Sequence, residues 1–197
     1  MSKSEKTKAF IIETVAPIFN KNGYSAMSLS KITKATGLTK GAIYGHFENK
    51  EEVAIAAFQF SVRKVLQDLN THVNKGKTPL EQLKRVATFY KNYYEYNLNL
   101  GGCPILNTGV DANNHNSLII AKVRSYNERI LDRFVNLIES CKAANQIKLT
   151  IDSVLYAKRF FAMIEGAVFM SYIMGDKSYM KELAIYMEEI IQRELQQ

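Results

Sequence analysis

Residues 38–50 read LTKGAIYGHFENK and contain the signals of one short helix. Thr39 is a favourable N-cap residue, so the stretch predicts a helix from about Thr39 to His46. Ile43 and Phe47 follow each other by one helical turn, which places both side chains on one face. We therefore expect this face to pack against the rest of the protein and the opposite face to stay accessible.

The outer side of this predicted helix is small and polar. Gly41 and Gly45 have no side chain that would hold the helix away from another surface, whereas Tyr44 and His46 end in hydrogen-bonding groups. The backbone N–H groups and the positive dipole end near Lys40 suit a phosphate group. A helix of this kind can enter the major groove of DNA closely.

A second short helix is predicted just before it. Ser28 is a suitable N-cap, Ile32 and Ala35 share a face, and Gly37 is a typical helix stop. The tight turn TGLT at residues 36–39 would join the two helices. The pair has the layout of a helix-turn-helix motif.

The remaining chain also favours helices. Of its 197 residues 47% are hydrophobic, only 3 are proline, and no stretch alternates apolar and polar residues as half-buried strands do. The sequence therefore predicts an all-α fold of about nine helices. Besides the two short helices, four are predicted over the ranges 4–22, which Gly23 closes, 116–146, with Asn116 as N-cap, 150–175 and 178–196. Three more are predicted to begin near residues 50, 79 and 104.

Charge is distributed unevenly along the chain. The formal net charge is +7, and residues 1–50 contain eight Lys against three Glu, whereas residues 151–197 contain five Lys or Arg against seven Asp or Glu. A basic end of this size indicates a polyanionic partner such as nucleic acid. A solvated lysine-rich surface would give the same composition, so charge alone does not decide between the two.

The patterns above occur together in residues 11–53, IIETVAPIFNKNGYSAMSLSKITKATGLTKGAIYGHFENKEEV. This stretch resembles the N-terminal DNA-binding domain of the TetR family of bacterial transcriptional regulators. The likeness rests on Phe-x-x-x-Gly-Tyr at 19–24, Gly-Leu-Thr-Lys-Gly at 37–41 and Tyr-x-x-Phe-x-x-Lys at 44–50. It departs from the family at Gly45, where a larger side chain is common.

The resemblance implies a helix-turn-helix DNA-binding domain over residues 1–48 and a larger helical domain over 49–197 for effector binding and dimerisation. The helix over 39–46 would lie in the major groove of a pseudo-palindromic, double-stranded operator. Two of the implied contacts, Ser28 and Thr39, would also be helix caps. The residues assigned to DNA are Ser28, Thr39, Lys40, Gly41, Ala42, Tyr44, His46 and Lys50.

The last two predicted helices suit an interface between subunits. Apolar residues recur at helical spacing in the last helix, and the preceding helix is apolar on more than one face. Together with the resemblance, this implies a homodimer through these two helices, although an intrachain core would give the same spacing. The pattern is carried by Met180, Leu183, Ala184, Met187, Ile190 and Ile191, and before them by Phe160, Phe161, Ile164, Ala167, Val168 and Tyr172.

The family usually holds a ligand pocket between the middle helices of its C-terminal domain. Several residues of this chain combine apolar walls with polar tips, as small-molecule pockets do. Ordinary core packing would use the same aromatic residues. The candidate ligand-binding residues are Phe60, Tyr90, Tyr93, Tyr94, Cys103, Asn107, Phe134 and Met163.

Cys103 lies in GGCP at the start of a predicted helix, where the helix dipole would favour the reactive thiolate. Its Gly-Cys pair is similar to a branch of the TetR family that includes electrophile- and oxidant-responsive repressors. Cysteine modification is therefore a second route by which the operator could be released. An inert core thiol is the alternative, and Cys141, late in a long helix, lacks this setting.

Other classes of protein fit less well. No Ser-His-Asp set, metal-ligand pair or Gly-rich phosphate loop is present, so we expect no catalytic residue, no metal site and no cofactor. An architectural DNA binder would share the basic end but would not need the large apolar C-terminal part. The chain begins without a secretory h-region, and its longest apolar run, at 160–174, is too short for a membrane span. The sequence thus predicts a cytoplasmic protein, and the resemblance implies a ligand-responsive regulator, usually a repressor in this family, with an effector of unknown identity.

Overall fold

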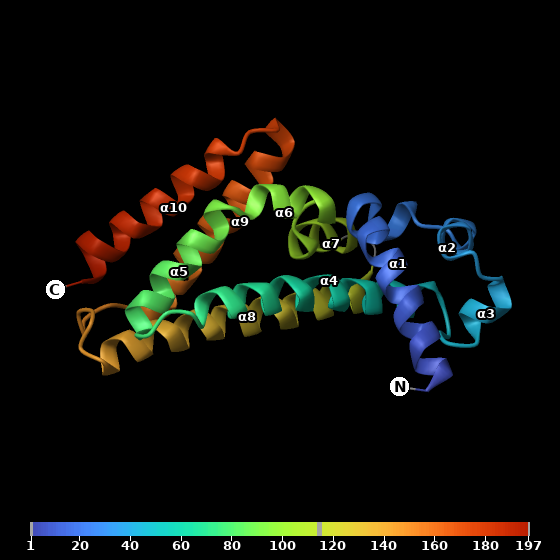
Figure 1. Ribbon diagram of the computed structural model, residues 1–197, viewed down its shortest axis with the longest axis horizontal. Coiled ribbons are helices and arrows are strands. Elements are labelled where there is room, and N and C mark those ends of the chain that lie inside the picture. The colour runs from blue at the N-terminus through green and yellow to red at the C-terminus, as the bar shows by residue number, and fades with distance from the viewer. Residues whose placement is uncertain (1, 114–115, 197) are drawn as a thin grey trace. The chain divides into compact units, whose positions relative to one another are not determined.

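The computed structural model describes residues 2–113 and 116–196, and every regular element in this part of the chain is a helix (Figure 1). The all-α prediction is therefore confirmed. No described helix is long and apolar enough to cross a membrane. The elements are α1 Lys3–Ala26, α2 Leu29–Thr36, α3 Lys40–Tyr44, α4 Lys50–Val73, α5 Pro79–Lys91, α6 Tyr93–Leu100, α7 Pro104–Ala112, α8 Ser117–Ala143, α9 Ser153–Met174, α10 Ser178–Ile190 and a closing π-helix, Ile191–Leu195.

The described residues form ten α-helices where the sequence predicted about nine. The additional helix arises at Asn92, whose φ of −106° and ψ of 10° end α5 before α6 begins. The apolar spacing of this region continues through the break, so periodicity alone could not locate it.

The chain forms two compact units. The first comprises the described residues of 1–65 and 99–124, and the second those of 66–98 and 125–197. Three helices, α4, α6 and α8, contribute residues to both units. The predicted boundary between residues 48 and 49 separates a DNA-binding domain from an effector-binding domain, which is a division by function. The compact units do not test it, so it stays a prediction.

The core of the first unit forms where α1, α2, α3 and the first turns of α4 and α8 bury their apolar faces together. Each of these amphipathic helices is too short or too polar to be stable alone, so burial of these faces supplies most of the stability. The fully or nearly fully buried residues include Ile11, Val15, Phe19, Met27, Ile32, Ile43, Phe47, Val53, Ala57 and Ile119.

The end of α1 is joined to α7 by polar contacts. Gly23 has a φ of 77° and interrupts the helical backbone of α1, as its position in the sequence predicted. Beyond this break, the Asp111 carboxylate accepts hydrogen bonds from the N–H groups of Tyr24 at 2.6 Å and Ser25 at 3.3 Å. These charge-assisted bonds replace the helical bonds lost at the break.

The loop before α7 lies against the last regular turns of α1. The buried Asn20 amide donates to the carbonyls of Leu100 and Gly102, and the Asn107 amide donates to those of Asn20 and Gly101. Two neighbouring asparagines thus tie the chain from α6 to α7 onto α1.

We expect Gly101→Ala to destabilise the protein by about 1–3 kcal/mol. Gly101 has a φ of 79°, and an added Cβ would lie 2.8 Å from the Cβ of Lys21, so both strain and a clash oppose the change. The melting temperature should fall by about 2–4 °C per kcal/mol. Gly45→Ala is the matched control, since its backbone is right-handed helical and its Cβ would meet no atom closer than 3.4 Å. Equal melting temperatures for the two variants would contradict this account of the loop.

In the second unit α10 packs on both α5 and α9. The apolar stripe of α10 that suggested a subunit interface lies inside the chain: Met180 and Met187 are fully buried, and Leu183, Ala184 and Ile190 nearly so. That interpretation of the stripe is therefore wrong, because helical spacing identifies a buried face but not the element that covers it. A different face of α9 and α10 is exposed.

Candidate nucleic-acid interface

Side-chain caps start the two helices α2 and α3. The Ser28 hydroxyl accepts a hydrogen bond from the N–H of Lys31 at 3.3 Å, and the Thr39 hydroxyl accepts one from the N–H of Ala42 at 3.1 Å. Gly37 ends α2 in the left-handed conformation, with a φ of 69°. The predicted helix-turn-helix arrangement and its caps are confirmed.

Helix α3 is shorter than its predicted range of 39–46. Regular α-helix covers only Lys40–Tyr44, and Gly45 and His46 form the turn that follows. The His46 N–H donates to the Ile43 carbonyl at 3.0 Å, which tightens this last turn. Gly45 itself has a right-handed φ of −71°, so its backbone does not require glycine.

The two faces of α3 differ sharply. Ile43 is fully buried and Phe47 is 2% exposed, so they anchor the helix to the core. Thr39, Lys40, Gly41 and Tyr44 are exposed on the other side, and Ala42 is partly exposed. A Cβ added to Gly41 would meet no atom within 4 Å. This face carries polar groups and is open around Gly41.

Two lysines near α3 lie over aromatic rings. The Lys40 ammonium is 5.8 Å from the ring centre of Tyr44, and the Lys50 ammonium is 4.1 Å from that of Tyr24. Such cation–π contacts restrict where the charge can point. Tyr24 was not among the predicted site residues, because its proximity to Lys50 depends on how α1 packs against α4.

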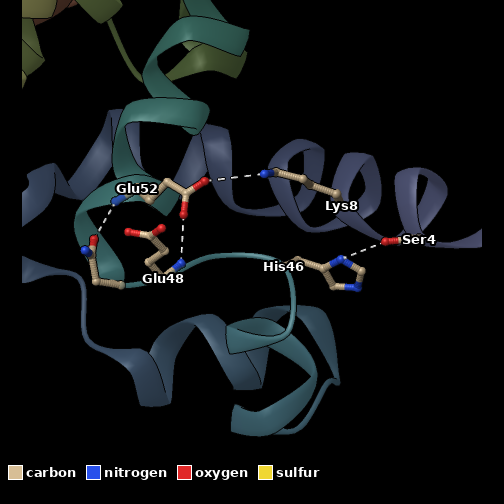
Figure 2. A network of polar contacts seen from close by, with 6 residues as sticks. Ser4, Lys8, His46, Glu48 and Glu52 are labelled. Carbon is tan, nitrogen blue, oxygen red and sulfur yellow. Dashed lines mark hydrogen bonds and ion pairs between the residues drawn. The ribbon is translucent and has the colours of Figure 1, made fainter.

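The turn after α3 is tied to the start of α1 (Figure 2). The Nδ1 of His46 lies 3.4 Å from the Ser4 hydroxyl, and the Lys8 ammonium pairs with the Glu52 carboxylate at 3.4 Å. The same ammonium lies 4.8 Å from the ring centre of Phe47. The first turns of α1 therefore brace the segment that follows α3.

The start of α4 is fixed in the same network. The Asn49 side chain accepts a hydrogen bond from the N–H of Glu52 at 2.9 Å, which is one half of a capping box. The Glu52 carboxylate, however, accepts from the N–H of Glu48 at 2.7 Å and not from that of Asn49 (Figure 2). Lys50 follows this cap directly and so begins a well-anchored helix.

The predicted ligand-binding residues are divided between the two compact units. Phe60, Cys103 and Asn107 belong to the first unit, whereas Tyr90, Tyr93, Tyr94, Phe134 and Met163 belong to the second. The rings of Tyr90 and Tyr93 pack on each other with centres 5.3 Å apart, and both are nearly buried. Among the described residues, no cluster of His, Cys, Asp or Glu could hold a metal ion.

The second unit contains a cavity of about 250 Å³. Of the predicted ligand residues only Phe134 is in its wall; the other seven are not lining residues of this cavity. Sequence spacing gave no signal for it, because its walls come from three helices that are separate in the chain. The lining residues are Leu66, Leu69, Asn70, Val73, Val86, Ile130, Arg133, Phe134 and Leu137.

Comparison with known families agrees with this architecture. Residues 11–57 match the family described as "Bacterial regulatory proteins, tetR family". Residues 79–187, more than half of the chain, match the family described as "Tetracyclin repressor-like, C-terminal domain". The first match contains α2, α3 and their caps, and the second contains most of the second unit.

Individual relatives extend over nearly the whole chain. A TetR-family transcriptional regulator from Cytophaga hutchinsonii is 34% identical, with 98% of this chain and 96% of that chain covered and a TM-score of 0.91. A TetR regulator from Chloroflexus aurantiacus J-10-FL is 28% identical, with 100% and 99% covered and a TM-score of 0.93. The fatty acid metabolism regulator protein of Bacillus subtilis (strain 168) is 24% identical over 173 residues, which cover 86% of this chain and 84% of that protein. The chain therefore belongs to the TetR family and is a DNA-binding transcriptional regulator rather than an enzyme.

Proposed function

We propose that the protein is a homodimeric repressor that binds a pseudo-palindromic operator near its own gene and leaves it when a small molecule binds. The observation that carries this proposal is α3, whose polar face is open while Ile43 and Phe47 hold its back to the core. Repression is the usual mode of regulation in the family. Action on chromosomal DNA places the protein in the cytoplasm.

The predicted DNA-binding residues on and after α3 divide into two kinds of DNA contact. Lys40, Gly41 and Ala42 would lie near base edges or the sugar-phosphate edge of the major groove, and Tyr44 and Lys50 near phosphates. Ser28 and Thr39, already helix caps, would add hydroxyl contacts to phosphates. His46 is held by Ser4, so its contribution would be to position the turn as well as to meet a phosphate.

Lys50→Gln should weaken binding to every DNA sequence by a similar factor. One phosphate contact is lost, so the slope of log affinity against log salt concentration should decrease by about 0.9. Lys64→Gln removes the same charge from an exposed site farther along α4 and serves as the control. Anisotropy titrations at several salt concentrations would measure both slopes. If Lys50→Gln and Lys64→Gln changed the slope equally, Lys50 would not contact DNA.

We propose that the dimer forms through the exposed face of α9 and α10. Several large apolar side chains are accessible there, whereas other apolar residues of both helices are buried. A patch of this kind is typical of a subunit interface. Its members are Leu155, Phe169, Ile173 and Met174 on α9 and Ile185 and Tyr186 on α10.

The cavity of the second unit is the proposed effector site. Its apolar walls and few polar groups match the composition of small-molecule pockets. Both α4 and α8 line it, and both also contribute to the first unit. An effector that favours one tilt of α4 would therefore change the spacing of the two α3 helices in the dimer. The difference between its affinities for the two states sets how far it shifts the equilibrium between them.

Cys103 supports a second release mechanism, by thiol modification. It is the N-cap residue of α7, and its side chain is 8% exposed. Burial raises the pKa of the Cys141 thiol to about 11, so Cys141 should stay unreactive. Cys103→Ser is thus expected to abolish any loss of operator binding caused by N-ethylmaleimide or hypochlorite. If the variant stayed as sensitive as the wild type, Cys103 would not be the sensor.

A footprint on the DNA upstream of the gene tests the proposal as a whole. Two protected half-sites related by a twofold axis, with centres separated by about 34–36 Å or a multiple, are expected for a dimer that reads DNA with two helices. One unpaired protected site, or protection without sequence preference, would contradict it.

A further inference from the structure

The cavity of the second unit is apolar except at two positions. Seven of its nine lining residues are aliphatic or aromatic, and the other two are Asn70 on α4 and Arg133 on α8. Its volume of about 250 Å³ is just below the range of about 300–1,000 Å³ typical of pockets for drug-sized ligands. The walls therefore suit a small molecule with a compact apolar body.

The two polar lining groups have unused hydrogen-bonding capacity. Within the described part of the chain, neither the Arg133 guanidinium nor the Asn70 amide forms a hydrogen bond or an ion pair. Both residues are exposed, so their polar ends lie toward the open side of the cavity. The lining contains no carboxylate that could neutralise the arginine.

From this arrangement we infer that the effector is a small amphipathic acid. Its anionic group, a carboxylate in the simplest case, binds Arg133 with the Asn70 amide as a second donor. Its apolar body lies against Leu69, Phe134 and Leu137. This inference rests on the proposed function, because it names the chemical class of ligand for the proposed effector site.

The chemistry of the site discriminates between ligand charges. A guanidinium binds a carboxylate through two parallel hydrogen bonds, and such charge-assisted bonds are roughly twice as strong as neutral ones. A cationic ligand would meet the arginine charge with no compensating acid in the lining. A neutral amide of the same shape would keep the apolar contacts but lose the ion pair.

Two pairs of probes test the inference: octanoate with octanamide, and 4-phenylbutyrate with 4-phenylbutanamide. The full-length protein is titrated with each by calorimetry, and release of labelled operator is followed by anisotropy. We expect at least one acid to bind about tenfold or more tightly than its amide. Arg133→Gln should remove this preference and leave amide binding nearly unchanged, whereas Arg129→Gln, on the same helix but outside the cavity lining, should preserve it.

The possible outcomes separate the inference from the proposed function. Acid binding that depends on Arg133 but does not release the operator would support the ligand class and contradict the effector role. Equal binding and equal operator release by an acid and its amide would support the effector role and overturn the ligand class. Failure of both acids to bind, or an acid preference that persists in Arg133→Gln, would also overturn the inference.

Discussion

Phe169→Asp is expected to convert the dimer into a folded monomer that has lost most of its operator affinity. Phe169 lies on α9 with 47% of its side chain exposed in the single chain, so the substitution creates no cavity in the core. In a symmetric dimer the two aspartates would lie near each other in an apolar interface, where unpaired charges are costly. The folded monomer should therefore retain its helical content.

The loss of affinity follows from the loss of bivalency. Two α3 helices held at a fixed spacing gain about 10²–10⁴-fold over one, because the second binds within the same complex. Light scattering would give the mass of Phe169→Asp, and anisotropy its operator affinity. Val110→Asp introduces the same charge at a 70% exposed residue of α7 and should stay dimeric. A dimeric Phe169→Asp with unchanged affinity would contradict the proposed interface.

The second large effect is expected from added bulk on α3. Gly41→Leu should leave the fold intact, since Gly41 is exposed and an added Cβ meets no atom within 4 Å. Leucine has a higher helix propensity than glycine, so the substitution should stabilise the helix by about 0.5–1 kcal/mol. The same side chain would keep α3 from approaching the groove. Operator affinity should then fall toward the non-specific level, by at least ~10²-fold.

Lys64→Leu is the control for an exposed apolar side chain elsewhere in the first unit. It should retain specific binding apart from the small effect of one lost charge. Gly41→Ala should lie between the wild type and Gly41→Leu, because a methyl group takes less of the space near the DNA. If Gly41→Leu bound the operator as tightly as the wild type, α3 would not lie in the groove.

Local signals in the sequence were sufficient to predict the starts of several helices. Ser28 and Thr39 cap the helices that they were expected to cap, and Thr78 caps the helix predicted to begin at residue 79. A cap depends on residues three positions apart, so its chemistry is visible before the chain is folded. The Glu81 carboxylate accepts a hydrogen bond from the N–H of Lys77, the residue before the cap, at 2.7 Å. The Glu52 carboxylate likewise bonds to the residue before its cap and not to the cap residue itself.

Features that depend on packing between distant segments were harder to predict. The spacing of Met180, Leu183 and Met187 showed that one face of α10 is buried, but α5 and α9 rather than a second subunit cover it. Ile185 and Tyr186, which are exposed, do not belong to that pattern. Periodicity reports burial without naming the partner.

The cavity illustrates the same limit. Tyr90 and Phe134 are both buried aromatic residues on helices, yet only Phe134 lines the cavity. Whether an aromatic side chain fills a core or borders a void depends on the residues facing it from other helices. The unpaired Arg133 could be recognised only after α4 and α8 were seen to line one cavity.

Binding to the DNA upstream of the gene, compared with a scrambled duplex of equal length over a salt series, tests the central claim most directly. The open face of α3 and the proposed dimer predict a preference of ~10³-fold or more for the upstream duplex at physiological salt. They also predict that the preference persists as salt weakens both affinities. Equal affinities for the two duplexes, falling steeply together with salt, would show only non-specific attraction to the basic end and would contradict specific operator binding there.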